Sequence, residues 1–457
     1  MFLPILKTVQ DVAEAQLCAG CGVCAHLDPQ QIKLVDDFDT GRRPMARQQT
    51  IQNTPAQRDA MAACPGATLT APSTPRNINA QHRKLSKTWG PVLAVWEGHA
   101  TDHDIRFAGS SGGAATALSL FAIQKENMAG VIHTAARDDL AHLNRTVFST
   151  TRSELLERTG SRYAPASPAE GLHHAESAAT PCMFVGKPCD VAAVTAAISR
   201  RPELHQKIGL TLAMFCAGAP STRGTFKLLE RLGIPKPENL KHLRYRGNGW
   251  PGRATAHYET HDGTTGTASM HYEEAWGDIL QAHRPWRCHI CPDHTGELAD
   301  ISVGDPWHHP AQPGDPGRSL IVARTPRGLA FVKAAQAAGY LTLSPANIAD
   351  IAASQPHLQR VRAAVGLRLL ACRLRGIRTP RFHGFFLAHN TWQHLSLKQK
   401  LRSFAGTWRR IKTRGLSHPR PVIAAPLDTS QKPTPPDTCP NATPSLSTPP
   451  SPCLATN

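Results

Sequence analysis

The sequence at residues 18–24 is CAGCGVC, which places Cys18, Cys21 and Cys24 at intervals of three residues. The small residues between them let the backbone curl around a compact inorganic core and donate amide N–H groups to its sulfides. A distant cysteine followed by proline, Cys64, completes the ligand pattern of a [4Fe-4S] cluster. Zinc is the less favoured alternative, because zinc sites usually take their ligands from two separated pairs. The pattern predicts one iron-sulfur cluster here and a role in electron transfer.

Length and composition allow more than a ferredoxin. The 457 residues can form two or three domains, and the 40% hydrophobic content can fill their cores. The 12 cysteines occur in tight local sets and not in the even scatter of a disulfide framework. The N-terminus has no secretory signal pattern, and no apolar run reaches the roughly 18 residues of a membrane span. These features predict a reducing, cytoplasmic setting.

The net charge of +17 is concentrated in one segment. Residues 351–426 contain 15 Lys and Arg and no Asp or Glu, which leaves residues 1–350 near neutral. Within this segment, residues 395–414 have apolar side chains at near-helical spacing between the basic ones. Three uses stay open: docking of an acidic carrier such as ferredoxin, contact with an anionic membrane surface, or a solvated extension. No base-reading motif indicates specific binding of nucleic acid.

The order of segments predicts a mixed α/β (α+β) fold. Short apolar runs repeatedly precede a turn rich in Gly, Pro or Cys and then a helical pattern. The last residues are rich in Pro, Ser and Thr, so they cannot offset the entropy of ordering. The expected parts are a ferredoxin-like module at 1–75, a linker to about Lys87, an α/β domain at 88–350, a basic helical extension at 351–420 and a disordered tail at 421–457.

A Gly/Ser-rich turn, Ser110-Ser111-Gly112-Gly113, precedes a helical pattern that runs to about Lys125. A strand-like run follows at residues 130–136. Such a turn exposes amide N–H groups and the positive end of the helix dipole, so it can bind a phosphate. A plain helix cap with close packing explains the same residues equally well. Both interpretations stay open.

Two further units place a cysteine just after a strand. Strands are expected at about 182–186 and up to near Cys216, followed by helices from Asp190 and from about Ser221. Cys189 and Cys216 would then lie beyond the C-terminal ends of parallel strands, where open α/β sheets bind ligands.

Cys288 and Cys291 form a C-x2-C pair, which is two ligands short of a metal site. Cys189 and Cys216 are the best donors of the missing thiolates, since both follow strands of the same domain. Cys182 stands at the start of its strand and would lie at the wrong end. A second [4Fe-4S] cluster is favoured, and zinc stays the alternative. Three cysteines have no partner in spacing and are expected not to bind metal: Cys372, Cys439 and Cys453.

The chain resembles the coenzyme F(420) hydrogenase/dehydrogenase beta-subunit family, which includes 7-hydroxymethyl chlorophyll a reductase-like iron-sulfur flavoproteins. The resemblance extends from about Cys18 to Arg327. It rests on the motifs CAGCGVC, SSGGAATAL, TGSRYAPAS, FVGKPCDV, FCAGAPS, RYRGNGWPG and CHICPDHTGELADISVGDPW. The motifs are specific to the family, but the family acts on several kinds of substrate.

The resemblance implies a flavoprotein with FAD in the α/β domain and [4Fe-4S] clusters that feed it. Two clusters are expected, the second on Cys189, Cys216, Cys288 and Cys291. Many relatives carry a two-cluster module at the N-terminus, whereas this chain has cysteines for one cluster there. The residues expected around the flavin are Ser110, Ser111, Gly112, Gly113, Arg162, Tyr163, Lys187 and, at the end of a strand, Gly304 and Asp305.

These parts predict an oxidoreductase that passes electrons from a donor such as ferredoxin through the clusters to FAD and on to an organic acceptor. The acceptor classes are a deazaflavin coenzyme, a pigment or a sugar-related substrate. Lys187 or Arg162 is expected to stabilise negative charge and His289 to supply a proton. A phosphate contact or a surface position is the alternative for each. Two other classes stay open: an electron-transfer subunit that serves a separate catalytic protein, and a binding protein whose metals hold the fold.

Overall fold

The computed structural model describes residues 6–73 and 80–427. The chain up to Ala425 forms one compact unit, and the fold below is the fold of that unit. The domain boundaries expected near residues 75, 88 and 350 stay predictions. The segments that they would separate pack tightly against one another.

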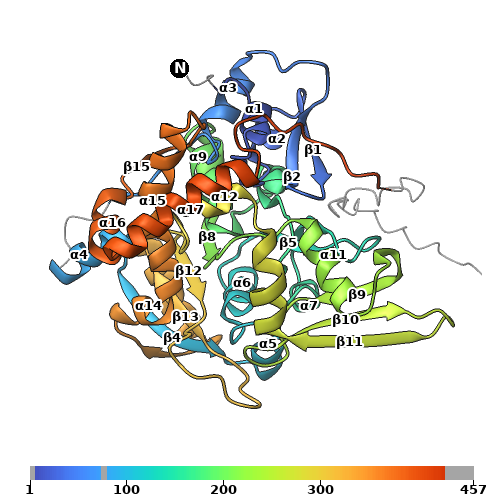
Figure 1. Ribbon diagram of the computed structural model, residues 1–457. Helices are drawn as coiled ribbons and strands as arrows, with labels where there is room; N and C mark the ends of the chain where they lie inside the picture. Colours follow the sequence, from blue (N-terminus) through green and yellow to red (C-terminus); the bar gives the residue numbers. More distant parts are fainter. Residues whose placement is uncertain (1–5, 74–79, 428–457) are drawn as a thin grey trace, which may run out of the picture. The chain divides into compact units, whose positions relative to one another are not determined.

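A mixed sheet of eight strands lies at the centre of the fold (Figure 1), in the order β14-β4-β13-β12-β8-β7-β5-β6. The middle strands β12, β8, β7 and β5 run parallel. The other pairings are antiparallel. The strands are β4 (Ala94–Ala100), β5 (Val131–Ala136), β6 (Asn144–Ser149), β7 (Cys182–Gly186), β8 (Ile208–Met214), β12 (Ile301–Gly304), β13 (Ser319–Ala323) and β14 (Leu341–Pro345). The predicted mixed α/β architecture is confirmed.

Helices cover both faces of this sheet, because the side chains of its buried strands alternate between two cores. Phe184 of β7 packs in a core with residues of α9 and α15, while Met183 and Val185 pack in a second core with α6 and α13. The helices around the sheet are α5 (His103–Ala108), α6 (Ala114–Gln124), α7 (Arg152–Glu157), η1 (Pro168–Gly171), α8 (Leu172–Ser177), α9 (Pro188–Ile198), α10 (Glu203–Lys207), α12 (Trp286–His289), α13 (Pro326–Ala337) and α14 (Ala349–Ser354).

A smaller antiparallel sheet, β11-β10-β9, projects from the main body (Figure 1). Its strands are β9 (Leu240–Arg244), β10 (Arg253–Glu259) and β11 (Thr265–His271). The neighbouring helices are α11 (Thr222–Arg231), η2 (Pro237–Asn239), the π-helix η3 (Glu273–Ile279) and η4 (Leu280–His283). Leu228, Leu243 and Leu280 pack in a shared apolar core. This subdomain was not expected from the sequence, and the loops at its ends supply part of the candidate site.

The N-terminal module is a short set of elements that packs on the main body. They are α1 (Val9–Glu14), α2 (Val23–Leu27), β1 (Ile32–Asp37), β2 (Gly41–Ala46), α3 (Pro55–Ala62) and β3 (Thr68–Thr70). Ser167 of the main body donates its hydroxyl to the Gly20 carbonyl at 2.8 Å. The Ala169 amide donates to the Cys21 carbonyl at 3.0 Å. The first cysteine loop is therefore fixed by hydrogen bonds from the α/β body.

The predicted linker up to Lys87 is wrong where the structure describes it. Residues 80–89 form helix α4 (Ala80–Trp89), and Trp89 at its end is buried. Trp89 packs in a core with Val95 and Leu320 of the central sheet. The polar sequence before Trp89 thus forms a helix, α4, which packs on the central sheet through the Trp89 ring.

The basic C-terminal segment is largely helical and packs against the rest of the compact unit. It forms α15 (Pro356–Leu374), β15 (Arg381–His383), α16 (Leu387–His394) and α17 (Leu397–Thr413). β15 pairs in parallel with β3 of the N-terminal module. Val365, Cys372 and Ile411 are buried in the same core as the first cysteine set. Cys372 packs among apolar residues of this core, and its expected lack of a metal role stays a prediction.

The predicted tail at 421–457 begins too early. The Arg420 amide donates to the Glu14 carbonyl at 2.8 Å, and the Ala425 amide donates to the Asp36 carbonyl at 2.7 Å. Residues 421–425 thus bind the N-terminal module. Cys439, Cys453 and the rest of the predicted tail from residue 428 lie outside the described residues. None of the helices in the described ranges has the length and apolar character needed to cross a membrane.

Candidate functional site

The first thiol set, Cys18, Cys21, Cys24 and Cys64, surrounds one small space beside α2. All four cysteines are buried and none is in a disulfide. Glycines make the loop possible, because Gly20 and Gly22 adopt φ values of 73° and 89°. Burial raises the pKa of Cys64 to about 11. Burial, followed by the neighbouring thiols, raises the pKa of Cys21 well above its usual value.

The second thiol set joins residues that are far apart in the sequence: Cys189, Cys216, Cys288 and Cys291. Cys189 lies in the first turn of α9 after β7, and Cys216 follows β8. Burial, followed by the charge of Cys288, raises the pKa of Cys216 to about 12. Burial raises the pKa of Cys189 too, and Cys216 and Cys291 add to that shift. The structure brings the four predicted residues into one neighbourhood and leaves Cys182 buried at the opposite end of β7.

The spacing of the sulfurs fits a large cluster better than a single ion. Within the described ranges, no three sulfur atoms of either set lie within 4.8 Å of one another. Four thiolates around one zinc ion would be about 3.8 Å apart, from a Zn–S length of about 2.3 Å. The residues present therefore fit a [4Fe-4S] group at each set.

Arg287 lies between the two thiol sets and was missed by the sequence analysis. It is buried, and its Nη2 donates to the carbonyl of Pro65, the residue after Cys64, at 3.1 Å. Although burial alone favours the neutral form, Cys291 and Cys189 raise the pKa of the guanidinium. Its Nε has no hydrogen-bond partner in the described protein. No local signal identifies Arg287, because its role depends on contacts with two distant segments.

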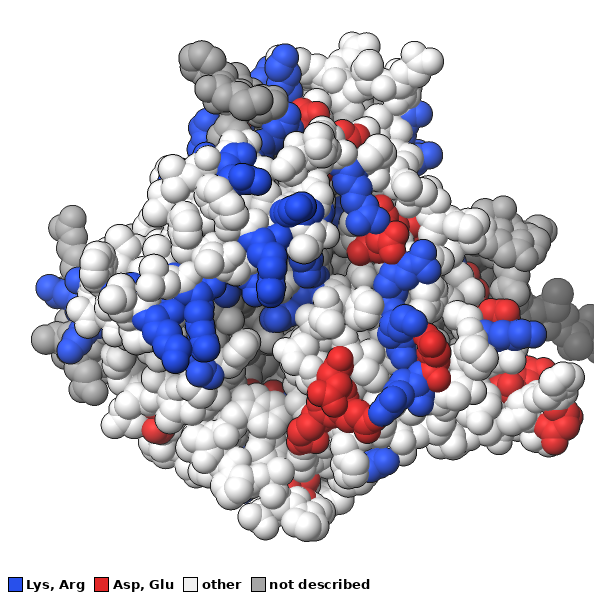
Figure 2. Space-filling model, viewed as in Figure 1, with Lys and Arg blue, Asp and Glu red and all other residues white. Residues whose placement is uncertain are grey.

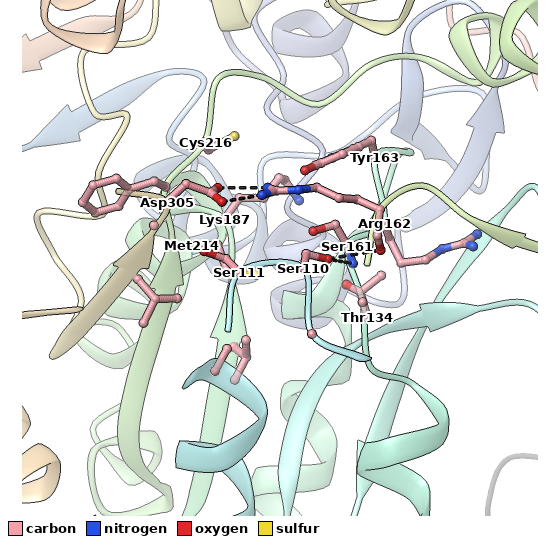
Figure 3. Close-up of a pocket in the computed structure, with 18 of the residues that line it drawn as sticks. Ser110, Ser111, Thr134, Ser161, Arg162, Tyr163, Lys187, Met214, Cys216 and Asp305 are labelled. Atoms are coloured by element: carbon pink, nitrogen blue, oxygen red, sulfur yellow. Dashed lines mark hydrogen bonds and ion pairs between the residues drawn. The ribbon is translucent and has the colours of Figure 1, made fainter. Parts of the chain in front are cut away.

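A cavity of about 320 Å³ opens beside the second thiol set (Figure 3). The C-terminal ends of β7, β8 and β12 form its floor, and the turn before α6 closes one side. Cys216 and Lys187 line it, so the cavity and the second thiol set share a wall. Aromatic rings line it further: Tyr163, Tyr272, Trp276 and Trp307. The cavity thus lies where parallel α/β sheets bind ligands.

Most of the predicted flavin residues line this cavity: Ser110, Ser111, Gly113, Arg162, Tyr163, Lys187, Gly304 and Asp305. Gly112 does not line the cavity, and its assignment to the flavin stays a prediction. Its φ is 68°, and a Cβ atom there would lie 2.6 Å from the Cα atom of Arg318. Gly113 has φ 71° and would bring a Cβ atom 2.4 Å from the Ile105 carbonyl oxygen. The fold itself requires both glycines, as the helix-cap interpretation predicted.

The serines of the turn are also held by the protein. The Ser111 hydroxyl donates to the Arg318 carbonyl at 2.8 Å, and the Ser110 hydroxyl accepts from the Ser161 amide at 2.8 Å (Figure 3). What remains for a ligand is the first turn of α6, whose residues Ala114 to Thr116 line the cavity. The first amides of a helix have no partner within it. They are the groups at this wall that suit a phosphate.

Lys187 and Arg162, the two residues predicted to stabilise negative charge, have different partners in the structure. The Lys187 ammonium lies 2.7 Å from an Asp190 carboxylate oxygen. Burial lowers the pKa of Lys187, but Asp190 and Cys189 raise it more, so the side chain stays cationic. The Arg162 guanidinium donates to Asn144 Oδ1 at 2.8 Å and to the carbonyls of Leu243, Ala141 and Leu143. Its charged end is occupied by the protein, so the structure gives Arg162 a role in holding the cavity wall.

His289 does not line the cavity, and the proton-donating role predicted for it does not fit its position. Its Nε2 lies 3.2 Å from a nitrogen of Arg414. Burial, followed by the charges of Arg414 and Arg284, lowers the pKa of His289 to about 2. His289 is therefore neutral at physiological pH and faces arginines. The histidine in the cavity wall is His133, whose Nε2 lies 2.7 Å from the Ser149 hydroxyl.

Arg246 and Asp305 form a second ion pair in the cavity wall, and Figure 3 shows the position of Asp305. The Arg246 Nη1 donates to Asp305 Oδ2 at 2.9 Å, and Trp250 Nε1 donates to Asp305 Oδ1 at 2.8 Å. The guanidinium carbon of Arg246 lies 4.6 Å from the ring centre of Tyr272 and 5.1 Å from that of Trp307. Sequence reasoning missed Arg246, although it stands in the motif RYRGNGWPG. This cluster gives the cavity a flat, cationic-aromatic wall.

Lys and Arg gather on the face that α17 and α15 form (Figure 2). The exposed basic residues of α17 include Lys398, Arg402, Arg409 and Lys412. Two apolar side chains on the same helix, Leu397 and Leu401, are 73% and 63% exposed, whereas Ile411 is fully buried. The predicted basic helix is present, and its last turn anchors it to the core.

Two segments of the chain match the family described as "Coenzyme F420 hydrogenase/dehydrogenase, beta subunit". Residues 95–172 match the N-terminal part of that family, and residues 180–348 match its C-terminal part. Both segments lie after the first thiol set, and together they contain the second thiol set and most of the cavity wall.

Two individual relatives are similar to this chain over more than half of its length. Coenzyme F420 hydrogenase subunit beta of Methanococcus voltae is 27% identical over 275 residues, which are 58% of this chain and 87% of that protein. The protein of the same name from Methanosarcina barkeri is 25% identical over 264 residues, which are 56% of this chain and 83% of that protein. A solved F420-reducing [NiFe] hydrogenase complex of Methanosarcina barkeri contains a chain that is 20% identical. It gives a TM-score of 0.47 and covers 74% of this chain and 98% of that one.

Proposed function

This chain belongs to the coenzyme F420 hydrogenase/dehydrogenase beta-subunit family, and from that premise we propose that it is an iron-sulfur flavoprotein oxidoreductase. The observation that supports this most is the position of Cys216, which belongs to the second thiol set and also lines the large cavity. A redox group on these thiols would lie directly against a group in the cavity. In the proposed order, electrons enter at the first thiol set, move to the second and reach FAD in the cavity.

Each thiol set is proposed to hold one [4Fe-4S] cluster. The first uses Cys18, Cys21, Cys24 and Cys64, and the second uses Cys189, Cys216, Cys288 and Cys291. Arg287 donates to the Pro65 carbonyl and is electrostatically coupled to Cys291 and Cys189, so one side chain connects the two sites. Its cationic charge offsets part of the negative charge that thiolate-bound clusters bring into a buried place.

The cavity is proposed to bind FAD. When bound, FAD supplies the exchange between one-electron transfer from clusters and two-electron transfer to an organic molecule. The first turn of α6 would bind a phosphate through its amides. The rings of Tyr163, Tyr272 and Trp307 suit a flat aromatic ligand. Lys187 remains protonated between Asp190 and the thiols, so it would stabilise added negative charge at the inner end of the cavity.

The donor is proposed to be an acidic carrier such as ferredoxin, steered to the chain by the exposed basic face of α17. The acceptor is proposed to be an organic molecule, with a deazaflavin coenzyme as the first candidate, because the names of the curated relatives refer to coenzyme F420. A cytoplasmic location suits free thiols that bind clusters.

A second candidate function is that of an electron-transfer subunit that serves a separate catalytic protein. The observation that favours it is that both curated relatives carry the name of a hydrogenase subunit. In that case the same path would end on a partner protein and not on a free small molecule.

One experiment separates these functions. The protein is purified without oxygen, its bound flavin is reduced with dithionite, and reoxidation is followed by absorbance. Reoxidation by coenzyme F420 or another small organic acceptor supports the enzyme, and reoxidation by a protein alone supports the electron-transfer role. Zinc without flavin would overturn both. Cys372→Ser is the matched control for cysteine substitutions, because Cys372 is a buried free thiol on α15 that belongs to neither thiol set.

A further inference from the structure

A cluster of two histidines and one glutamate lies outside both thiol sets. Glu97 belongs to β4, and His308 and His309 belong to the loop after β12. His308 Nε2 lies 2.9 Å from Glu97 Oε1, and His309 Nε2 lies 2.8 Å from Glu97 Oε2. Across the two described ranges, this is the single group of three His, Cys, Asp or Glu residues whose ligand atoms lie within 4.8 Å of one another.

We propose that Glu97, His308 and His309 bind a divalent transition-metal ion of the zinc type. Two imidazole nitrogens and one carboxylate form a ligand set that zinc uses in proteins, with a further position left for water or a ligand oxygen. The same set suits other first-row ions such as Co²⁺. The site does not depend on the proposed function, because it shares no residue with the thiol sets.

A second contact orients one of the ligands. His308 Nδ1 lies 2.6 Å from the Ser354 hydroxyl at the end of α14. Metal-binding histidines usually donate their other ring N–H to such a group, which fixes the tautomer and turns the free nitrogen toward the metal. Here the Ser354 contact leaves Nε2 of His308 facing Glu97. The site is therefore built from the central sheet, one loop and one helix.

The partial burial of the site suits an exchangeable ion. The side chains of Glu97, His308 and His309 are 18%, 24% and 37% exposed. A metal ion can therefore enter from solvent and keep a water ligand, while the carboxylate stays mostly shielded. The ring centres of His308 and His309 are 4.1 Å apart, so both imidazoles can contact one ion beside Glu97.

The site adjoins the wall of the large cavity on two elements. Trp307, which precedes His308, lines the cavity, and its ring lies 5.6 Å from that of Tyr272 in a stacked arrangement. Gln355, which follows Ser354, also lines the cavity and donates to the Asp305 carbonyl at 2.8 Å. A metal on Glu97, His308 and His309 would therefore fix the loop that presents Asp305 and Trp307 to the cavity.

The test uses Co²⁺ as the probe on the intact, cluster-loaded protein under anaerobic conditions. Calorimetry is expected to show one Co²⁺ bound per chain, and the visible spectrum is expected to show weak bands of nitrogen and oxygen ligation without a thiolate charge-transfer band. Glu97→Gln and His309→Ala are each expected to weaken binding more than tenfold. Ser354→Ala is expected to weaken it about tenfold, the lower end for loss of a contact to a ligand histidine.

The matched control is His173→Ala. His173 and His174 are also adjacent histidines with rings 4.1 Å apart, but their nitrogens do not form a three-ligand group among the described residues. This variant is expected to bind Co²⁺ as the parent does. Iron content and melting temperature check that each variant is folded. Co²⁺ should raise the melting temperature of the parent and not that of Glu97→Gln.

Three results would overturn the proposal. The first is a parent protein that takes up no Co²⁺ beyond its clusters. The second is binding of Co²⁺ by both Glu97→Gln and His309→Ala with the affinity of the parent, and the third is thiolate ligation of the bound Co²⁺. A parent protein that binds Co²⁺ as expected, but whose reduced flavin is reoxidised by no small acceptor and by no protein, would count against the proposed function alone.

Discussion

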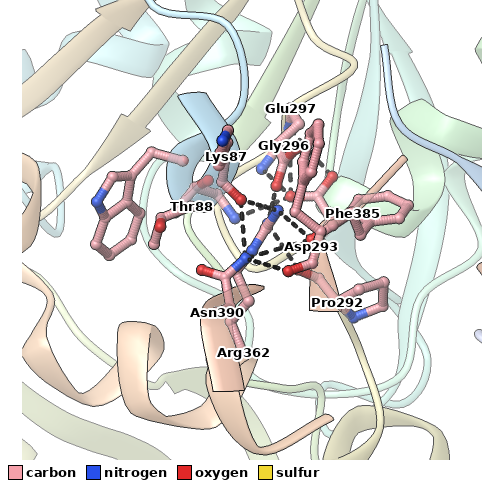
Figure 4. Close-up of polar contacts among 12 residues, drawn as sticks. Lys87, Thr88, Pro292, Asp293, Gly296, Glu297, Arg362, Phe385 and Asn390 are labelled. Atoms are coloured by element: carbon pink, nitrogen blue, oxygen red, sulfur yellow. Dashed lines mark hydrogen bonds and ion pairs between the residues drawn. The ribbon is translucent and has the colours of Figure 1, made fainter. Parts of the chain in front are cut away.

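Replacing Arg362 should destabilise the protein strongly, because this side chain joins the C-terminal helices to the second thiol set. Figure 4 shows its guanidinium beside residues that are distant in the sequence, such as Lys87, Glu297 and Phe385. Arg362 forms an ion pair with Glu297, and the two side chains are 4% and 2% exposed. Its Nη1 also donates to the carbonyl of Pro292, the residue after Cys291, at 2.9 Å.

The size of the effect follows from this burial. Arg362→Met removes the cation but leaves the Glu297 carboxylate buried, and breaking a buried ion pair in this way costs about 3–5 kcal/mol. The substitution also removes the hydrogen bonds that Arg362 donates to the carbonyls of Lys87 and Phe385, both at 3.3 Å. A whole domain is stable by only about 5–15 kcal/mol. The substitution therefore removes a large part of the stability.

The assay is anaerobic urea denaturation followed by tryptophan fluorescence, with iron content measured on the same samples. Arg360→Met is the control, because Arg360 is exposed on the same helix, and it should change stability by less than about 0.5 kcal/mol. The double variant Arg362→Met with Glu297→Met should regain most of the loss, since no charge then stays buried alone. Equal stability of Arg362→Met and Arg360→Met would refute this reasoning.

Three further outcomes are expected. Gly113→Ala should lower the melting temperature and the yield of folded protein, because φ is positive and a Cβ atom would clash with backbone, whereas Gly277→Ala, with open space around it, should not. Burial lowers the pKa of His133 to about 4 in the folded protein, so as the pH falls the unfolded chain takes up a proton on His133 before the folded chain does. The stability should therefore be full above about pH 6.5 and decrease as the pH falls towards 4. His133→Gln should reduce that decrease. Arg409→Gln with Lys412→Gln should slow reduction by ferredoxin at low salt and leave reduction by dithionite unchanged; loss of binding to anionic vesicles with unchanged ferredoxin kinetics would instead assign this face to a membrane surface.

The sequence predicted those parts of the fold that have a local pattern. The strand at 182–186 was placed correctly because an apolar run ends at a Gly-Lys-Pro turn. The convergence of Cys189 and Cys216 followed from one rule, that parallel strands end at the same edge of a sheet. The helix after Gly113 was predicted from its apolar period and its glycine start.

The rest depends on contacts between distant segments, for which no local pattern exists. Arg246 pairs with Asp305 across 59 residues, and Arg362 pairs with Glu297 across 65 residues. The charge run at 351–426 suggested an exposed basic surface for a carrier, a membrane or solvent, yet Arg362 within it is buried. The close approach of Arg318 to Gly112 is another such contact, which the sequence of the turn does not indicate.

Two iron-sulfur sites, the second of them against a flavin cavity, should be visible in the iron content of cysteine variants purified without oxygen. The parent should contain about eight iron atoms per chain, from two clusters of four. Cys18→Ser and Cys288→Ser should each contain about half of that, and Cys372→Ser should contain the full amount. Unchanged iron in Cys288→Ser, or zinc in place of iron in the parent, would contradict the assignment of two iron-sulfur sites.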